Sequence, residues 1–242
     1  MRVEVQPAFV LHSRPYRDSS AIVELFTAEY GRFSAVARGV RRAGKRRAQV
    51  VVNQPFVPLL VSFSGRSELK TLGQCELAGR PHRLQGDSLL SGLYLNELLM
   101  RLLHRHDPHP RLFAAYGSAI ESLGHGDALE PELRQFELQL IDELGYSFDF
   151  GADAASGEGV REDCLYVYEA EVGMVATQQR PASGKPAYQG ADLRRIAAGE
   201  VTGEAAGTAK RLLREVLSGH LGHEPLRSRA LFRSTRNQGE QP

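Results

Sequence analysis

Short apolar segments, each followed by turn-forming residues, fill the first 80 residues and constrain the fold more than any other feature. Five of them have the length and the β-branched or aromatic content of strands: 8–11, 21–27, 32–38, 56–64 and 68–77. In the fourth, Val57, Leu59, Val61 and Phe63 occupy every second position, as in a strand with one buried face, and Pro58 predicts an edge or a bulge. Five short antiparallel strands predict a small barrel, because closing a sheet removes its exposed edges. The long connection between the third and fourth strands favours an OB-fold, although an SH3-like barrel fits the same pattern.

From residue 81 onward, apolar residues recur at the spacing of helices instead. A wide stripe of leucines follows Asp87 and Ser88, which we predict to be the N-cap of a helix. Further helices are predicted at 111–124, 130–145, 192–198 and 204–218, with a loop at 151–163 and a small β-hairpin near 164–177. The sequence therefore predicts an α+β protein with a five-stranded antiparallel OB-fold barrel at 1–80, a mainly helical domain at 81–235 and a disordered tail at 236–242.

Charged residues are also distributed unequally between the two predicted domains. The net charge is only +1, but residues 1–80 hold 13 Lys and Arg against 6 Asp and Glu, whereas residues 81–242 hold 17 against 23. A domain of net charge +7 followed by one of −6 indicates two different partners, one of them anionic. The chain has only two cysteines, Cys75 and Cys164, no signal-peptide pattern and no apolar run of membrane-spanning length. We therefore expect an intracellular protein in a reducing compartment, without a membrane partner.

The positive charge of the first domain is concentrated in one segment. Eight cationic side chains and no carboxylate stand between Glu29 and Glu68, and residues 37–47 read A-R-G-V-R-R-A-G-K-R-R. Arginine binds phosphate through its bidentate guanidinium, and contacts with nucleic-acid phosphates release counterions. We predict nucleic-acid contacts at nine positions: Arg32, Arg38, Arg41, Arg42, Lys45, Arg46, Arg47, Arg66 and Lys70. The alternative for this run is a solvated surface loop.

Three aromatic residues near this segment, Tyr16, Tyr30 and Phe33, could stack on bases, which is the second requirement for binding single strands. Phe33 lies in an alternating strand pattern, which favours a position in the core.

Polar clusters give little support to catalysis. In H-R-H-D-P-H, His104 and His106 would point in nearly opposite directions on a helix, so a helix end explains this segment better than a metal site formed with Asp107 and His109. His220 and His223 also resemble a helix terminus. No phosphate-binding loop, dinucleotide fingerprint, metalloprotease helix or serine-hydrolase motif occurs. We therefore predict a binding protein and not an enzyme, with no cofactor, no metal and no small-molecule substrate.

Four stretches, in this order, resemble the RecO family of bacterial recombination mediators. They are L-F-T-A-E-Y-G-R-F-S-A-V-A-R-G-V-R-R, S-G-L-Y-L-N-E-L-L, L-R-Q-F-E-L-Q-L-I-D-E-L-G-Y and P-L-R-S-R-A-L-F, and the resemblance extends over residues 7–233. It implies an OB-fold followed by a helical domain, in a bacterial cytoplasmic protein associated with the nucleoid. It also implies binding to single- and double-stranded DNA and annealing of complementary strands. Together with RecR, a member of this family loads RecA onto DNA coated by single-stranded-DNA-binding protein.

The resemblance further implies that the helical domain receives the acidic, apolar C-terminal tail of that coating protein. The matching stretch offers Arg134 for a tail carboxylate, with Leu133 and Leu138 as apolar neighbours, whereas Phe136 is better explained as core. Some family members carry a four-cysteine zinc module near 151–180. Only Cys164 is present there in this chain, so we predict no zinc.

Two other functions fit parts of the pattern. One is an RNA-binding OB-fold protein of translation or RNA processing, which would prefer strands that carry 2′-hydroxyl groups. The other is a metal-dependent nuclease that uses His104 and His109, whose cleavage a chelator would abolish. The charge contrast also suggests that the acidic part of the chain masks the basic segment until a partner binds.

Overall fold

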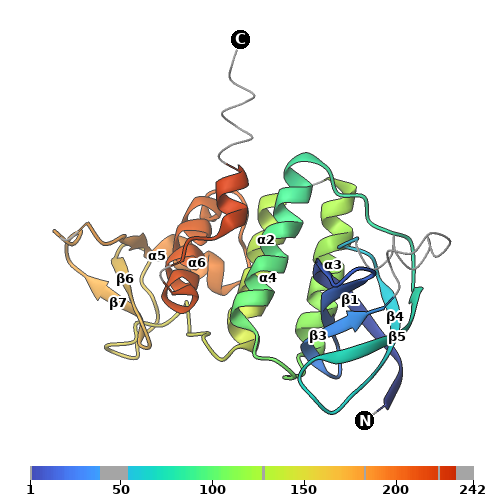
Figure 1. Cartoon of the computed structure of the whole chain (residues 1–242). Coiled ribbons are helices and arrows are strands. Elements are labelled where there is room, and N and C mark those ends of the chain that lie inside the picture. The colour runs from blue at the N-terminus through green and yellow to red at the C-terminus, as the bar shows by residue number, and fades with distance from the viewer. Residues whose placement is uncertain (1, 39–53, 127–128, 183, 223, 233–242) are drawn as a thin grey trace. The chain divides into compact units, whose positions relative to one another are not determined.

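The computed structural model describes residues 2–38, 54–126, 129–182, 184–222 and 224–232 (Figure 1). Contacts divide the chain into two compact units, Met1–Asp127 with Pro225–Pro242, and Ala128–Glu224. We call the first the barrel unit and the second the acidic unit. The acidic unit holds 17 Asp and Glu against 9 Lys and Arg, a net charge of −8, which leaves +9 for the barrel unit. The charge contrast is therefore larger between these units than between the halves on either side of residue 80, and the domain boundary at residue 80 stays a prediction.

Five strands form a closed barrel in the order β1-β2-β3-β5-β4 (Figure 1). Neighbouring strands are antiparallel except β3 and β5, which pair in parallel at Ala35↔Lys70 and Val36↔Thr71. This single parallel pairing closes the sheet in the strand order of an OB-fold, so the OB-fold prediction is confirmed and the SH3-like alternative is set aside. The strands are β1 Arg2–Tyr16, β2 Ser20–Thr27, β3 Gly31–Ala37, β4 Leu59–Ser64 and β5 Lys70–Leu77.

The first strand is much longer than the segment predicted at 8–11. Residues 12–16, which contain turn-forming types, continue the strand because they pair with β2 from His12↔Glu24 to Tyr16↔Ser20. The turn lies at 17–19 instead. Pro58 stands just before β4, and the pairing of β4 with β5 is irregular between Val61 and Phe63.

The inside of the barrel is filled by alternate side chains of its strands. Val23, Leu25 and Phe33 are completely buried, and the Phe33 ring lies 4.5 Å from the ring of Phe63, centroid to centroid. The core interpretation of Phe33 is thereby confirmed. Tyr30 is partly buried against the same cluster.

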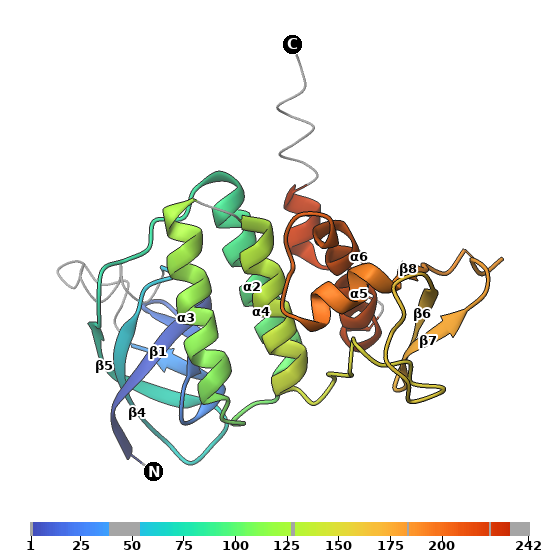
Figure 2. The same cartoon turned by 180° about the vertical axis from the view of Figure 1, so that it is seen from behind.

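Two helices, α2 (Gly86–Leu102) and α3 (Pro110–His125), complete the core of the barrel unit, and Figure 2 shows α3 running alongside the barrel strands. Phe9 of β1 packs against Phe113 and Tyr116 of α3, with ring centroids 5.5 and 5.0 Å apart. Asn96 of α2 donates to the carbonyl of Leu11 and accepts the Tyr116 hydroxyl at 2.6 Å. Burial raises the pKa of Tyr116, so this phenol stays a neutral donor inside an apolar contact.

The start of α2 differs from its prediction. Its N-cap is Gln85, which makes no side-chain capping hydrogen bond, and Asp87 lies in the first turn. The prediction of Asp87 and Ser88 as the cap was therefore wrong, although a carboxylate in the first turn still favours the positive end of the helix dipole.

A short helical segment at 227–232 returns to the barrel unit from the far end of the chain. The carboxylate of Glu97 on α2 accepts the backbone N–H groups of Arg227 and Ser228 at 2.8 and 2.9 Å and the Ser228 hydroxyl at 2.6 Å. Leu226, just before it, is 4% exposed. A carboxylate thus satisfies the first donors of this helix from outside it.

The acidic unit combines three helices with a small sheet. The helices are α4 Leu129–Glu143, α5 Gly190–Ala197 and α6 Ala205–Leu221, and the strands β6 Leu165–Glu169, β7 Gly173–Thr177 and β8 Tyr188–Gln189 have the order β7-β6-β8. β6 and β7 form an antiparallel hairpin. Ile196, Val201, Ala205 and Ala209 form a buried cluster against which Leu138 packs. Among the described residues, no helix is long and apolar enough to cross a bilayer. The predicted tail at 236–242 lies outside the described residues.

Candidate nucleic-acid interface

The nine cationic residues predicted to contact nucleic acid have different surroundings. Arg38 and Arg66 are exposed. Arg32 and Lys70 are largely buried, as described below. The other five lie outside the described residues: Arg41, Arg42, Lys45, Arg46 and Arg47. Of the four cations that the structure describes, two are therefore exposed and two are largely buried.

Arg32 takes part in a buried ionic network. Its guanidinium lies 3.2 Å from the Glu24 carboxylate and donates to the carbonyl of Leu103, and its side chain is 11% exposed. Arg105, from the segment after α2, binds the same carboxylate at 3.2 Å and donates to the Ser34 hydroxyl at 2.6 Å. Glu24 therefore holds two arginines and joins β2 and β3 to the segment after α2.

Lys70 is also engaged within the fold. It is 8% exposed, and its ammonium group donates to the carbonyl of Ser67 at 2.8 Å. Arg66 stands in the same β4–β5 connection with its side chain in solvent. Of these two cations, only Arg66 has its charge accessible from the solvent.

One end of the barrel carries a partly exposed aromatic ring and two exposed arginines. Tyr16 pairs with Ser20, and Ala21 pairs with Ala37, so the β1–β2 turn and the end of β3 lie at this end of the barrel. Arg38 follows directly after β3. The guanidinium carbon of Arg17 lies 5.1 Å from the centre of the Tyr16 ring. We call Tyr16, Arg17 and Arg38 the barrel-end cluster.

Sequence reasoning named Arg38 and the stacking ring of Tyr16, but missed Arg17. This residue has a left-handed backbone, with φ of 52°. The signal was present in the run S-R-P-Y-R-D, but the run was interpreted as a plain turn. Arg14, also exposed, lies in the same stretch, where Asp18 is a carboxylate of opposite charge.

The segment H-R-H-D-P-H closes onto the barrel. The N–H of His106 donates to the carbonyl of Arg32 at 2.9 Å, and its ring stacks on Phe33 with an interplanar angle of 11°. A side chain at Gly31 would meet the Asp107 carbonyl oxygen at 2.0 Å, so only glycine fits there. Burial, with the charges of Lys70 and Arg105, lowers the pKa of His106. These contacts give the segment a packing role in the barrel unit.

In the part of the chain that the structure describes, no three His, Cys, Asp or Glu side chains are grouped as metal ligands would be.

The residues predicted to bind an acidic tail lie on α4. Arg134 is 6% exposed and donates to Glu137, itself 1% exposed, at 2.8 Å. Leu133 is 7% exposed, and Leu138 packs against the core of the acidic unit. Phe136 is 2% exposed, as its core interpretation predicts.

Comparison with known proteins gives consistent matches along the whole chain. The family models "Recombination protein O N terminal" and "Recombination protein O C terminal" match residues 1–80 and 83–230. The chain is 44% identical over 236 residues to "DNA repair protein RecO" of Methylococcus capsulatus, covering 97% of this chain and 95% of that protein. It is 43% identical over 240 residues to the protein of the same name from Nitrosococcus oceani, covering 99% and 96%, and 46% identical over 232 residues to that of Pseudomonas putida, covering 94% and 96%.

The chain belongs to the RecO family of DNA repair proteins.

The stretches that resemble the RecO family make contacts inside the fold. Asn96 and Glu97, from S-G-L-Y-L-N-E-L-L, bind Leu11 and the segment at 227–232. Arg32 lies in the first stretch and Ser228 in the last. The resemblance was therefore carried by residues that hold the RecO fold together, so it supports the fold more directly than it supports any contact with DNA.

Proposed function

We propose that this protein is a non-enzymatic recombination mediator. It binds single- and double-stranded DNA through its barrel unit and anneals complementary strands. With RecR, it loads RecA onto DNA coated by single-stranded-DNA-binding protein, in the bacterial cytoplasm at the nucleoid. Membership of a family of DNA repair proteins supports the DNA partner.

The observation that carries the proposal is the barrel-end cluster at the point where the basic run begins. Arg38 is exposed directly after β3, at the same end of the barrel as Tyr16 and Arg17. The residues from Arg41 to Arg47 continue from it in the sequence, and the whole barrel unit carries +9. A cationic surface with an aromatic ring is the combination that binds a single strand, since phosphates are neutralised while a base stacks.

Annealing needs no active site. Two complementary strands repel each other through their phosphates, and a surface that binds both lowers this repulsion so that base pairing proceeds faster. The basic run, Arg66, Arg38 and Arg17 are our proposed phosphate contacts. We propose that Arg32 and Lys70 act on DNA only indirectly, because both are engaged within the fold.

The acidic tail of the coating protein is our proposed partner for α4. Arg134 already pairs with Glu137, so a tail carboxylate would compete with an existing buried ion pair at this site. Leu133 and Leu138 remain its proposed apolar neighbours.

A salt series with a labelled single-stranded oligonucleotide tests the DNA contacts. The test variant is Arg41→Ala/Arg42→Ala/Arg46→Ala/Arg47→Ala. The control removes four arginines from the acidic unit: Arg161→Ala/Arg180→Ala/Arg194→Ala/Arg214→Ala. If the run makes about four phosphate contacts, the slope of log affinity against log salt flattens by roughly 3 in the test variant, at about 0.7 per contact.

The control variant keeps the slope of the native protein. Equal slopes for native and test proteins would contradict the proposed contacts, and tighter binding of an RNA strand of the same sequence would favour the RNA-binding alternative.

A further inference from the structure

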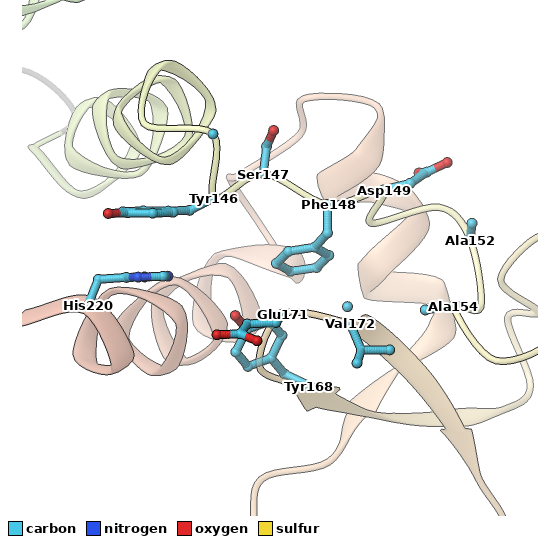
Figure 3. A pocket seen from close by; sticks show the side chains of 12 residues that line it. Tyr146, Ser147, Phe148, Asp149, Ala152, Ala154, Tyr168, Glu171, Val172 and His220 are labelled. Atoms are coloured by element: carbon cyan, nitrogen blue, oxygen red, sulfur yellow. The ribbon is translucent and has the colours of Figure 1, made fainter.

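The acidic unit contains a cavity of about 510 Å³ that the proposed DNA function does not use (Figure 3). Its walls come from the segment after α4, the β6–β7 hairpin and the end of α6. All of these belong to the acidic unit, so the cavity is complete within one compact body.

Aromatic rings form much of its wall. The rings of Tyr146 and His220 stack with centroids 3.6 Å apart and an interplanar angle of 3°. Phe148 lies 5.1 Å from Tyr168, centroid to centroid, and both rings face the cavity (Figure 3). Burial lowers the pKa of His220, so at neutral pH this ring is an uncharged stacking surface and not a cation. The cavity therefore offers the rings of Phe148 and Tyr168 to a ligand, beside a wall formed by the stacked pair of Tyr146 and His220.

A glutamate with an uncommon backbone conformation also lines this cavity. Glu171, at the tip of the β6–β7 hairpin, has φ of 65°, a left-handed conformation that glycine or asparagine normally fills at lower cost. The negative charge of Glu171 favours protonation of both Tyr168 and His220, which places it close to the two rings. Glu171 and Tyr168 both line the cavity (Figure 3). A glutamate at this strained position indicates that its side chain has a use.

The charged residues that line the cavity indicate which class of ligand it can bind. No lysine or arginine is among its twelve lining residues, whereas Asp149 and Glu171 both are, and the surrounding unit carries −8. Among the described residues, no lysine or arginine forms an ion pair with Glu171. Phosphates and acidic peptides are disfavoured here, and a cation is favoured.

We propose that this cavity binds the guanidinium of an arginine side chain presented by an otherwise apolar segment of a partner protein. A guanidinium is planar, so it stacks on tyrosine, histidine and phenylalanine faces while its fork pairs with a carboxylate. An ammonium group can approach a ring but lacks this planar fit. The two flanking apolar surfaces, at Phe148 and the 55% exposed Val172, suit apolar neighbours of that arginine.

The test uses the full chain and two rhodamine-labelled peptides, acetyl-Gly-Leu-Arg-Leu-Gly-amide and the same peptide with citrulline, which has the shape of arginine without its charge. Fluorescence anisotropy measures the two affinities. We expect the arginine peptide to bind about tenfold more tightly than the citrulline peptide.

Glu171→Gln removes this preference, whereas Glu169→Gln, on the same hairpin but outside the cavity, preserves it. Tyr146→Leu weakens both peptides, because it removes part of the aromatic wall and the ring on which His220 stacks. Equal binding of the two peptides to the native protein, or an arginine preference that survives in folded Glu171→Gln, would overturn the proposal. Thermal unfolding of each variant establishes that it is folded.

Discussion

Arg32 and Arg38 stand near the two ends of β3 and have opposite surroundings. Arg32 is largely buried between Glu24 and the Leu103 carbonyl, whereas Arg38 projects from the barrel end. The same residue type therefore stabilises the barrel at one position and is free to meet a ligand at the other.

We predict that Arg32→Ala lowers the free energy of unfolding by about 3 kcal/mol, because the buried Glu24 carboxylate loses one of its two arginines. Arg38→Ala changes it by less than about 0.5 kcal/mol, as expected for an exposed residue, but weakens oligonucleotide binding. Urea unfolding and anisotropy on both variants measure this. An Arg32→Ala protein of native stability with weakened DNA binding would show that Arg32 contacts DNA directly.

The difference between the buried Arg32 and the exposed Arg38 could be predicted only in part from the sequence. The hairpin register puts Glu24 opposite Ser34, and therefore diagonal to Arg32 across the two strands, so a careful strand alignment could have found this partner. Arg105 comes from beyond α2, and no local pattern predicts its arrival. A count of cations along a chain cannot show which of them already have a partner.

Among the elements, the helical segment at 227–232 depends on a single carboxylate. Glu97 accepts three hydrogen bonds from Arg227 and Ser228. Burial alone would raise the pKa of Glu97, but the hydrogen bonds from Ser228 and Arg227 together outweigh it and lower the pKa. The charged form is therefore the one that holds this segment.

We predict that Glu97→Gln costs about 1 kcal/mol, similar to the loss of a helix cap, and that amide exchange in 227–232 becomes about fivefold faster. Because the folded pKa lies below the ordinary 4.5, the contribution of Glu97 is complete above that pH and is lost as the pH falls through the lowered value. Hydrogen-exchange mass spectrometry at pH 7 and urea unfolding from pH 7 to 3 follow both effects.

Glu121→Gln, an exposed position on α3, serves as the control and keeps native exchange rates. If the difference between the native protein and Glu97→Gln grew as the pH fell, the assigned role of the charge would be wrong.

The periodicity of apolar residues predicted which segments are strands and which are helices, but it did not predict the residues at which they begin and end. Period-two and helical patterns predicted all five barrel strands and the main helices, because burial of one face imposes that spacing. Both ends of β1, residues 2–7 and 12–16, were missed, and in the second of these the pairing with β2 overrides the turn preference of Ser13, Arg14 and Pro15. The cavity was also missed, since Tyr146, Glu171 and His220 come from three separate elements.

The whole molecule is strongly polarised in charge, with +9 in the barrel unit and −8 in the acidic unit. We expect the negative charge of the acidic unit to compete with DNA for the basic run.

We predict that neutralising four carboxylates of the acidic unit, one partly exposed and three exposed, in Glu132→Gln/Asp142→Asn/Glu158→Gln/Glu200→Gln, tightens oligonucleotide binding about two- to fivefold at low salt. The gain disappears at high salt, where screening shortens the range of the interaction to a few ångströms. Anisotropy at both salt concentrations measures it. The same gain at high salt would contradict an electrostatic origin, and no gain at low salt would contradict masking.

The return of residues 225–232 to the barrel unit has a consequence for synthesis on the ribosome. About 100 residues of the acidic unit separate Asp127 from Pro225, and translation at about 5–20 residues per second needs roughly 5–20 s to add them. During that interval the nascent barrel lacks its last helical segment, and Glu97 has no Ser228 to bind. The unit whose synthesis begins first is therefore completed last. A premature stop anywhere in the acidic unit leaves both units of the protein unfinished.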